Sequence, residues 1–187
     1  MDPGALRSQD VSQSEALIAP PHEDSWTRFE ALYRSARDDV YGYVATLLRD
    51  PAAAEDVTAL AFERAYRRRR TFDRRRGEER AWLFGIARNA ALDELRRRRR
   101  LAGLMVDPED PGADAALEGA EVALRRTAVR AALDELTPRE REIVALKFHG
   151  GLSNGELARV LGVSASNAGT MVYRVMEKLR KACNETA

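Results

Sequence analysis

The charged residues of this 187-residue chain fall into blocks, and one block contains no base at all. Residues 101–121 carry six acids, no Lys or Arg, two prolines and three glycines. Before this stretch, residues 26–100 hold 19 Arg and 12 acids, and after it residues 122–187 hold 11 bases and seven acids. Proline, glycine and a run of like charges favour a linker over an ordered element. The sequence therefore predicts two small basic domains joined by a flexible acidic linker.

Both basic blocks have apolar residues at helical spacing, and neither alternates with the period of two that is typical of strands. In the first block this spacing predicts helices over residues 26–48, 52–68 and 80–100. Asp50 and Pro51 separate the first two, because Asp caps a helix and Pro suits its first position. Residues 1–24 lack the periodicity, and we expect a disordered leader there. The predicted fold class is all-α.

The second block contains two capping boxes and a helix-turn-helix pattern over residues 153–174. Thr137 with Glu140, and Ser153 with Glu156, have the spacing at which a cap and a Glu satisfy each other's backbone N–H groups. Gly162 then suits the turn, and Ser164 suits the cap of the second helix. This geometry favours a helix that enters a DNA groove. A three-helix core that contacts only protein is the alternative.

The composition argues against several other classes of protein. No run of about 18 apolar residues is present, so no membrane helix is expected, and the N-terminus does not have the pattern of a signal peptide. The single cysteine, Cys183, cannot form an internal disulfide and fits a reducing cytoplasm. The histidines, His22 and His149, have no cysteine nearby and predict no metal site. No catalytic constellation is visible, so we expect neither an enzyme nor a cofactor or small-molecule substrate.

Residues 67–100 hold fourteen arginines interleaved with aromatic residues. Arginine neutralises phosphates, and aromatic rings stack on unpaired bases, so this segment favours binding of nucleic acid. The alternative is a solvated basic face, with Trp82 in the core rather than on DNA. Residues 96–100 could also bind an acidic membrane or solvate a helix end.

The leading face of the last helix offers neutral hydrogen-bonding groups rather than charges. Ser166, Asn167 and Thr170 can donate to and accept from base edges, and Asn pairs well with adenine. Arg174 and Lys178 lie further along and suit phosphates. We expect base recognition from the first group and general affinity from the second.

A basic helical block, an acidic linker and a helix-turn-helix, in this order, resemble the extracytoplasmic-function (ECF) sigma factors of bacterial RNA polymerase. "FEALYRSARDDVYGYVATLLRD" is similar to the start of sigma region 2, and "AEDVTALAFERAYR" is similar to its polymerase-binding helix. "FDRRRGEERAWLFGIARNAALDELRRRRR" resembles the promoter-melting segment, and "RAALDELTPREREIVALKFHGGLSNGELARVLGVS" resembles region 4. The resemblance implies a leader at 1–24, region 2 at 25–98, an acidic linker at 99–121 and region 4 at 122–183.

The resemblance also implies partners and site residues. The partners are core RNA polymerase, through its clamp coiled coil and its flap, promoter DNA as duplex and melted strand, and an anti-sigma factor. For polymerase binding it implies Asp56, Phe62 and Arg64. For the −10 element it implies Arg74, Arg75, Arg76, Gly77, Trp82, Arg88, Asn89, Asp93, Arg96 and Arg97. For the −35 element it implies Ser164, Ser166, Asn167, Thr170, Arg174 and Lys178.

The chain departs from the family pattern at two places. Ala59 and Leu60 stand where the polymerase-binding helix usually has Gln followed by an acid, and Gly169 and Met171 stand where the reading helix usually has Lys or Arg. Two other functions therefore remain as alternatives. A stand-alone helix-turn-helix regulator would bind only duplex DNA, and a helical interaction module would have lost DNA binding.

Overall fold

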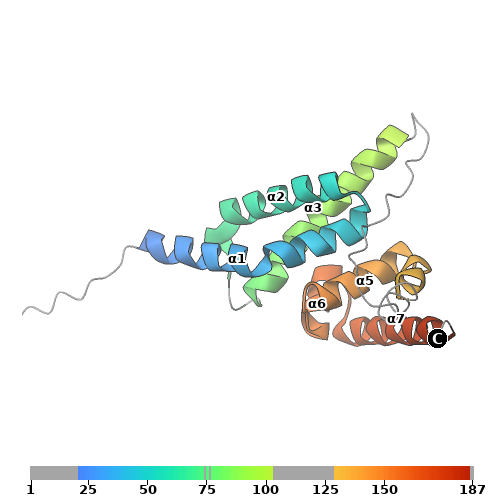
Figure 1. The fold of residues 1–187 in the computed structure, drawn as a ribbon. Coiled ribbons are helices and arrows are strands. Elements are labelled where there is room, and N and C mark those ends of the chain that lie inside the picture. Colours follow the sequence, from blue (N-terminus) through green and yellow to red (C-terminus); the bar gives the residue numbers. More distant parts are fainter. Residues whose placement is uncertain (1–20, 74, 76, 103–128, 186–187) are drawn as a thin grey trace, which may run out of the picture.

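The computed structural model describes residues 21–73, 75, 77–102 and 129–185, and the described part of the chain is helical without a strand. Figure 1 shows one group of helices above and a second group below it. In chain order the elements are α1 (Pro21–Leu48), α2 (Pro51–Arg68), the short 3-10 helix η1 (Arg69–Thr71), α3 (Glu79–Ala102), a helical stretch over residues 129–134, α5 (Pro138–Phe148), α6 (Asn154–Leu161) and α7 (Ala165–Glu185). The all-α prediction is confirmed.

Helices α1, α2 and α3 pack side by side and form what we call the N-terminal bundle (Figure 1). Helix α1 ends where Arg49 takes a left-handed φ of 51°, and Asp50 then caps α2 by accepting the backbone N–H of Ala53 at 3.1 Å. Pro51 occupies the first position of α2. A backbone N–H at this position has no partner within the helix, so the N–H that proline lacks is not missed there. The expected boundary between the first two helices is therefore correct. The fully buried Val40, Tyr43, Val44, Ala61, Leu83 and Phe84 form much of the core of this bundle.

Two expected boundaries are wrong. Helix α1 begins at Pro21, so residues 21–24 belong to a helix rather than to a disordered leader. Proline is well suited to a first helical turn. The residues around it lack apolar periodicity, so no helical pattern was visible there. Helix α3 continues to Ala102, so the predicted linker does not begin at residue 99. Arginine, leucine and alanine are all strong helix formers, and they extend α3 into that range. The rest of the predicted linker and leader lies outside the described residues.

Helices α5, α6 and α7, with the stretch over residues 129–134, form the C-terminal bundle. Both predicted capping boxes are present, Thr137 with Glu140 at the start of α5 and Ser153 with Glu156 at the start of α6. Acceptance of the backbone N–H of Thr137 lowers the pKa of Glu140, and the Ser153 hydroxyl and N–H lower the pKa of Glu156. Each carboxylate is therefore held in its charged form, which suits a position near the positive end of a helix.

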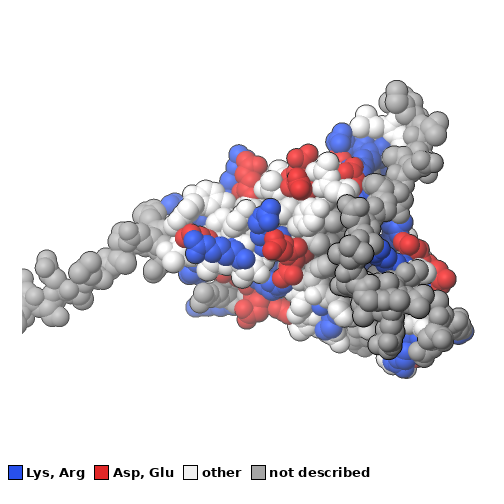
Figure 2. All heavy atoms as spheres, in the orientation of Figure 1, with Lys and Arg blue, Asp and Glu red and all other residues white. Residues whose placement is uncertain are grey.

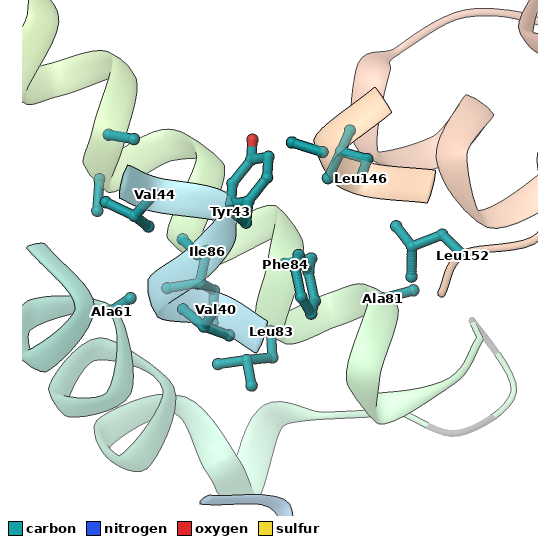
Figure 3. Close-up of a cluster of buried hydrophobic side chains, with 14 of the residues drawn as sticks. Val40, Tyr43, Val44, Ala61, Ala81, Leu83, Phe84, Ile86, Leu146 and Leu152 are labelled. Carbon is teal, nitrogen blue, oxygen red and sulfur yellow. The ribbon is translucent and has the colours of Figure 1, made fainter. Parts of the chain in front are cut away.

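The two bundles pack directly against each other, which the sequence did not indicate. Helix α1 contacts α5, and α3 contacts α6. Leu146 and Leu152 of the C-terminal bundle point toward Tyr43, Phe84 and the helices that carry them (Figure 3). The buried apolar side chains of the two bundles therefore form one continuous cluster across the boundary.

Candidate nucleic-acid interface

A helix-turn-helix places the start of α7 on the surface of the C-terminal bundle. Helix α6 ends at Gly162, whose φ of 69° is a left-handed conformation that glycine adopts without strain. Ser164 caps α7 by accepting the backbone N–H of Asn167 at 3.2 Å. Buried Leu157, Leu161 and Ala168 hold the two helices together. The predicted turn and cap are confirmed, and the first turn of α7 is left exposed.

The exposed edge of α7 carries the residues predicted to contact bases. Ser166 and Asn167 are exposed. Thr170 is exposed too, but its hydroxyl donates to the backbone carbonyl of Ser166 at 3.1 Å, so it offers acceptor capacity to a ligand. Arg174 is exposed one turn further on. The start of α7 can therefore make neutral hydrogen bonds, and Arg174 can make a charged contact further along the helix.

Lys178 is already engaged within its own bundle. Its ammonium donates to the backbone carbonyl of Glu135 and to the Glu140 carboxylate, each at 3.0 Å. The contact ties α7 to the start of α5. Its predicted role on phosphate stays a prediction, and a phosphate would have to compete with these two acceptors.

The far end of α3 carries a concentration of arginines. Figure 2 shows basic side chains gathered over this end of the molecule, whereas acidic and basic side chains alternate over α1 and α2. Arg96 and Arg97 are both more than half exposed, although each pairs with an acid of its own helix, Asp93 and Glu94 respectively. The pair of Arg96 with Asp93 is exposed on both sides, and such pairs contribute little and exchange readily for other partners. Arg96 is therefore available to bind a phosphate, whereas Arg97 is held by two hydrogen bonds to Glu94, whose side chain is largely buried.

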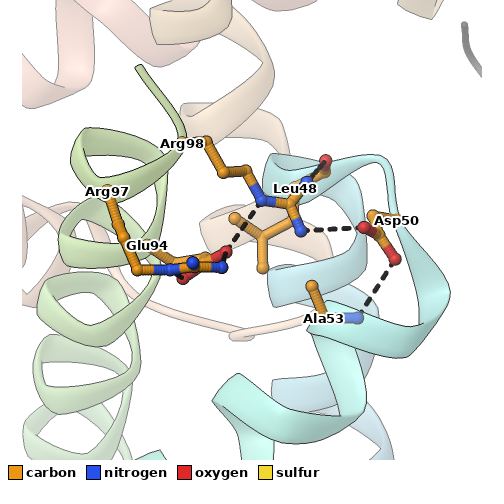
Figure 4. Close-up of polar contacts among 6 residues, drawn as sticks. All are labelled: Leu48, Asp50, Ala53, Glu94, Arg97 and Arg98. Carbon is orange, nitrogen blue, oxygen red and sulfur yellow. Dashed lines mark hydrogen bonds and ion pairs between the residues drawn. The ribbon is translucent and has the colours of Figure 1, made fainter. Parts of the chain in front are cut away.

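Arg98, in the middle of the same run, does something different (Figure 4). It points back toward the bundle and donates to Asp50 at 2.8 Å and to Glu94 at 2.9 Å. Hydrogen bonds from Arg97, and then from Arg98, lower the pKa of Glu94 to about 2. Capping of α2 at Ala53, followed by the contact with Arg98, lowers the pKa of Asp50. Arg98 thus ties the end of α3 to the corner between α1 and α2, a role that the sequence analysis did not assign.

The other residues predicted for the −10 element are distributed unevenly. Arg75 and Asn89 are exposed, whereas Arg74 and Arg76 lie outside the described residues. Trp82 is half-buried, and its ring lies 5.3 Å from that of Phe72 in a tilted arrangement. Because it is only half-buried, the ring can pack against the core and can also contact DNA. The remaining residues of this predicted set are Gly77, which lies against the Arg159 guanidinium of α6, Arg88, which binds Glu142 of α5, and Asp93, which bonds to Arg64.

Within the described part of the chain, no group of three or more His, Cys, Asp or Glu side chains is placed to hold a metal ion. The same residues include no helix long and apolar enough to span a membrane.

Comparison with known proteins decides which family this arrangement belongs to. Residues 32–101 match the family model for sigma-70 region 2, and residues 126–179 match that for sigma-70 region 4. The ECF RNA polymerase sigma factor SigK of Mycobacterium tuberculosis is 31% identical over 181 residues, which cover 92% of this chain and 93% of SigK. The chain belongs to the ECF family of RNA polymerase sigma factors. The ECF sigma factor BldN of Streptomyces coelicolor is 36% identical over 166 residues, which cover 85% of this chain but only 61% of BldN.

Two solved sigma factors have the same fold. RpoE of Bartonella quintana, in complex with the anti-sigma factor NepR, gives a TM-score of 0.72 at 22% identity over 84% of this chain and 98% of that chain. CnrH, in complex with the cytosolic domain of CnrY, gives 0.60 at 24% identity over 87% of this chain and 91% of that chain. The residues matched by the family model for region 2 form most of the N-terminal bundle, and those matched by the model for region 4 form most of the C-terminal bundle, so we call the two bundles region 2 and region 4.

Within region 2, the helix predicted to bind polymerase is α2. Asp56 is exposed, and Arg64 is partly exposed while it donates to Asp93 at 3.3 Å. Phe62 is only 5% exposed and stacks edge-on against Phe29 and Tyr33 of α1. Phe62 therefore supports the helix from within, and any direct contact with a partner falls to the polar residues.

The two departures from the family pattern have clear local settings. Leu60 is partly buried against the core, and Ala59 is exposed, so α2 presents less polar surface here than the usual Gln and acid would give. Gly169 faces the start of α6, where a Cβ atom would meet the Asn154 side chain at 3.5 Å, an ordinary contact distance. A larger residue at position 169 would therefore fit without disturbing the turn.

Sequence reasoning missed the residues that join the two regions. Glu142 is buried between them and pairs with Arg88, and Arg80 reaches from region 2 to the turn after α5. These contacts join residues more than 50 positions apart, and neither the spacing nor the composition of either segment signals them.

Proposed function

We propose that this sigma factor holds core RNA polymerase at a promoter through two separate DNA contacts, and that it traps the melted strand while the polymerase performs the chemistry. The observation that carries the proposal is the combination of an exposed reading edge on α7 in region 4 with an arginine-rich end of α3 in region 2. The residues between the two regions, including the acidic segment, then act as their connection.

Region 4 is proposed to bind the −35 element as duplex DNA. A helix-turn-helix sets the first turns of its second helix against base edges in the major groove. Ser166 and Asn167 are the exposed groups at this position, and Arg174 follows about two turns further along the helix. Sequence preference would then come from Ser166 and Asn167, and general affinity from Arg174.

Region 2 is proposed to bind the −10 element after it melts. Unpaired bases stack on aromatic rings, and their backbone is neutralised by arginines. The half-buried pair of Phe72 and Trp82 and the exposed Asn89, Arg96 and Arg97 lie on α3 and the loop that precedes it. Extrusion of a base costs a few kcal/mol, which a fitted pocket offsets.

The protein partners follow from the family. Core RNA polymerase is proposed to bind the exposed polar side of α2 through its clamp, and region 4 through its flap. The solved sigma factors with the same fold are complexes with anti-sigma factors. We expect an anti-sigma factor for this chain as well. Since the polymerase makes every covalent bond, the chain itself is proposed not to be an enzyme, and it would act in the cytoplasm with the polymerase and the chromosome.

Co-elution with core polymerase tests this proposal against the alternative of a stand-alone regulator. The purified chain is mixed with core polymerase and separated by size-exclusion chromatography, with and without promoter DNA. A sigma factor moves into the polymerase fractions without DNA. A regulator that binds only duplex DNA stays at its own elution volume in that experiment, and this result would contradict the proposal.

A further inference from the structure

An aromatic side chain near the start of α1 is left half uncovered by the fold. Trp26 is 53% exposed, and the one ring that it meets among the described residues is Tyr66 of α2, edge-on at 5.7 Å between ring centroids. Phe29, one turn further along α1, contacts the same Tyr66 ring at 5.2 Å and is partly buried against the core. Large aromatic rings stabilise a fold mainly through the area that they bury. Trp26 therefore gives the fold less than a buried aromatic residue would, and more than half of it is open to a ligand.

The ring of Tyr66 also carries a cation. The Arg69 guanidinium lies over this ring, 3.8 Å from its centroid, and Nη1 of Arg69 donates to the backbone carbonyl of Tyr66 at 2.7 Å. The hydrogen bond holds the guanidinium in place on the ring. We call Trp26, Tyr66 and Arg69 the Trp26 platform. Because aromatic rings and guanidinium planes both stack on nucleobases, its chemistry is that of a stacking site.

Positive charge lies beside the Trp26 platform, at the end of α2. Residues 64–70 contain five arginines and no acid. Arg67 makes an exposed pair with Glu63, of the kind that contributes little to stability. Arg68 is exposed and makes no ion pair within the described part of the chain. Both arginines can therefore bind the phosphates of a nucleic acid.

The same charge argues against a protein as the ligand of the Trp26 platform. A protein surface that covered Trp26 would also cover the neighbouring arginines, and burial of a charge is costly unless an acid pairs with it. A nucleic acid supplies the negative charge and the flat bases together. Unpaired bases are required, since the bases of a duplex are stacked on one another and do not expose their faces. Single-stranded nucleic acid fits this surface best.

The Trp26 platform lies close to the aromatic pair that is proposed to bind the melted strand. Only the short helix η1 separates Arg69 from Phe72, and Phe72 contacts Trp82. Three residues of chain place the Cα atoms of Arg69 and Phe72 at most about 11 Å apart. One strand of DNA advances about 3.4 Å per stacked nucleotide. A strand that leaves the pair of Phe72 and Trp82 can therefore reach the Trp26 platform within about three to four nucleotides.

We propose that the Trp26 platform is a second stacking site for single-stranded DNA, onto which the melted strand continues from Phe72 and Trp82. A base stacks on Trp26, and Arg67 and Arg68 bind the phosphates beside it. Because every base has a face that can stack, this site tolerates any sequence. The inference rests on the proposed function for the origin of the strand, whereas binding of a single strand at this place can be measured without polymerase.

Tryptophan fluorescence reports on this site directly, because the chain has two tryptophans, Trp26 and Trp82. In the full chain with Trp82→Phe, the emission comes from Trp26 alone. Titration with an unlabelled thymidine 12-mer at low salt should quench this emission, because a base stacks on the indole ring. A 12-base-pair duplex at the same concentration should not quench it. No quenching by the single strand at saturation would overturn the proposal.

Substitutions then measure what the Trp26 platform contributes to affinity, by fluorescence anisotropy of a labelled thymidine 12-mer. Trp26→Leu keeps an apolar side chain but removes the ring, and it should weaken binding at least about fivefold. Trp26→Phe keeps a ring and should bind within about twofold of the wild type. Arg68→Gln should reduce the slope of log K against log salt by about 0.7. Arg37→Gln is its matched control, because it removes an exposed arginine from α1 about three turns beyond Trp26 and should leave the slope unchanged.

The remaining outcomes separate this proposal from its alternatives. Equal affinities of Trp26→Leu and the wild type for the 12-mer would show that the ring does not bind DNA. Weaker retention of core polymerase by Trp26→Leu in pull-down, with unchanged affinity for the 12-mer, would show that a protein covers the Trp26 platform. If Trp26→Leu loses helicity by circular dichroism, the quenching measurement decides alone, because that variant keeps Trp26. Failure to co-elute with core polymerase would remove the proposed function and leave the measured binding of single-stranded DNA as it is.

Discussion

One residue within the run of arginines at the end of α3 should stabilise the fold rather than bind nucleic acid. Arg98 donates to Asp50 at 2.8 Å and to Glu94 at 2.9 Å, and its side chain is 29% exposed. Hydrogen bonds to charged groups contribute about 1.5–3 kcal/mol, whereas exposed ion pairs contribute about 0–1 kcal/mol. Since Arg98 lies between these cases, we expect Arg98→Ala to lower the free energy of unfolding by about 1–2 kcal/mol.

Thermal unfolding followed by circular dichroism measures this effect. For a chain of this length, 1 kcal/mol shifts Tm by about 2–4 °C, so a loss of about 1–2 kcal/mol means that Arg98→Ala should unfold about 2–8 °C lower than the wild type. Arg99→Ala is the matched control, because Arg99 is exposed and has no ion pair within the described part of the chain. Substitutions at such positions change stability by at most about 0.5 kcal/mol.

A second variant separates the ion pair from the helix cap. Asn is as good a cap as Asp, so Asp50→Asn keeps the start of α2 and removes only the charge that faces Arg98. The effects of Asp50→Asn and Arg98→Ala should therefore be less than additive in the double variant. Equal Tm values for Arg98→Ala and Arg99→Ala would refute this account of Arg98.

Three further predictions concern pH, base recognition and polymerase binding. Arg97 holds the pKa of Glu94 at about 2, below its ordinary 4.5, so the stabilisation by Glu94 is present above pH 4.5 and is lost as the pH falls toward 2. In urea unfolding at a series of pH values, the free energy of unfolding of Glu94→Gln should therefore fall less over this range than that of the wild type, by about 1–2 kcal/mol after solvent screening. Asn167→Ala should relax preference at one or two −35 bases by about 1–3 kcal/mol, whereas Arg174→Ala should weaken binding to every duplex and reduce the salt slope by about one, as titrations of −35 point mutants at several salt concentrations would show. Asp56→Arg should reduce retention of core polymerase in pull-down without lowering Tm, and unchanged retention would remove this part of α2 from the contact.

Local signals in the sequence predicted most of the secondary structure. Asp50 and Pro51, the Thr137 box and the turn at Gly162 each act within a few residues of where they stand, and each is found where it was expected. The starts and ends of α1 and α3 were misplaced because helix-forming residues continue beyond the apolar pattern. Boundaries set by propensity alone leave no periodic signal.

The roles of individual arginines depended on contacts that no local pattern encodes. Arg96, Arg97 and Arg98 are identical in sequence terms, yet helical rotation turns only Arg98 back toward Asp50. Arg88 was assigned to DNA by resemblance, and its burial against Glu142 arises from the packing of α3 against region 4. Such long-range pairs are fixed by tertiary structure and become visible only there.

Transcription with purified components tests the central claim most directly. Core polymerase is supplied with this chain and with fragmented DNA of the source genome, and the 5′ ends of the transcripts are mapped. We expect new start sites that share one −10 and one −35 sequence, with Asn167→Ala changing the preferred −35 bases only and Asp56→Arg yielding few transcripts. The same start sites from core polymerase alone, or no transcripts dependent on the chain, would contradict its function as a sigma factor.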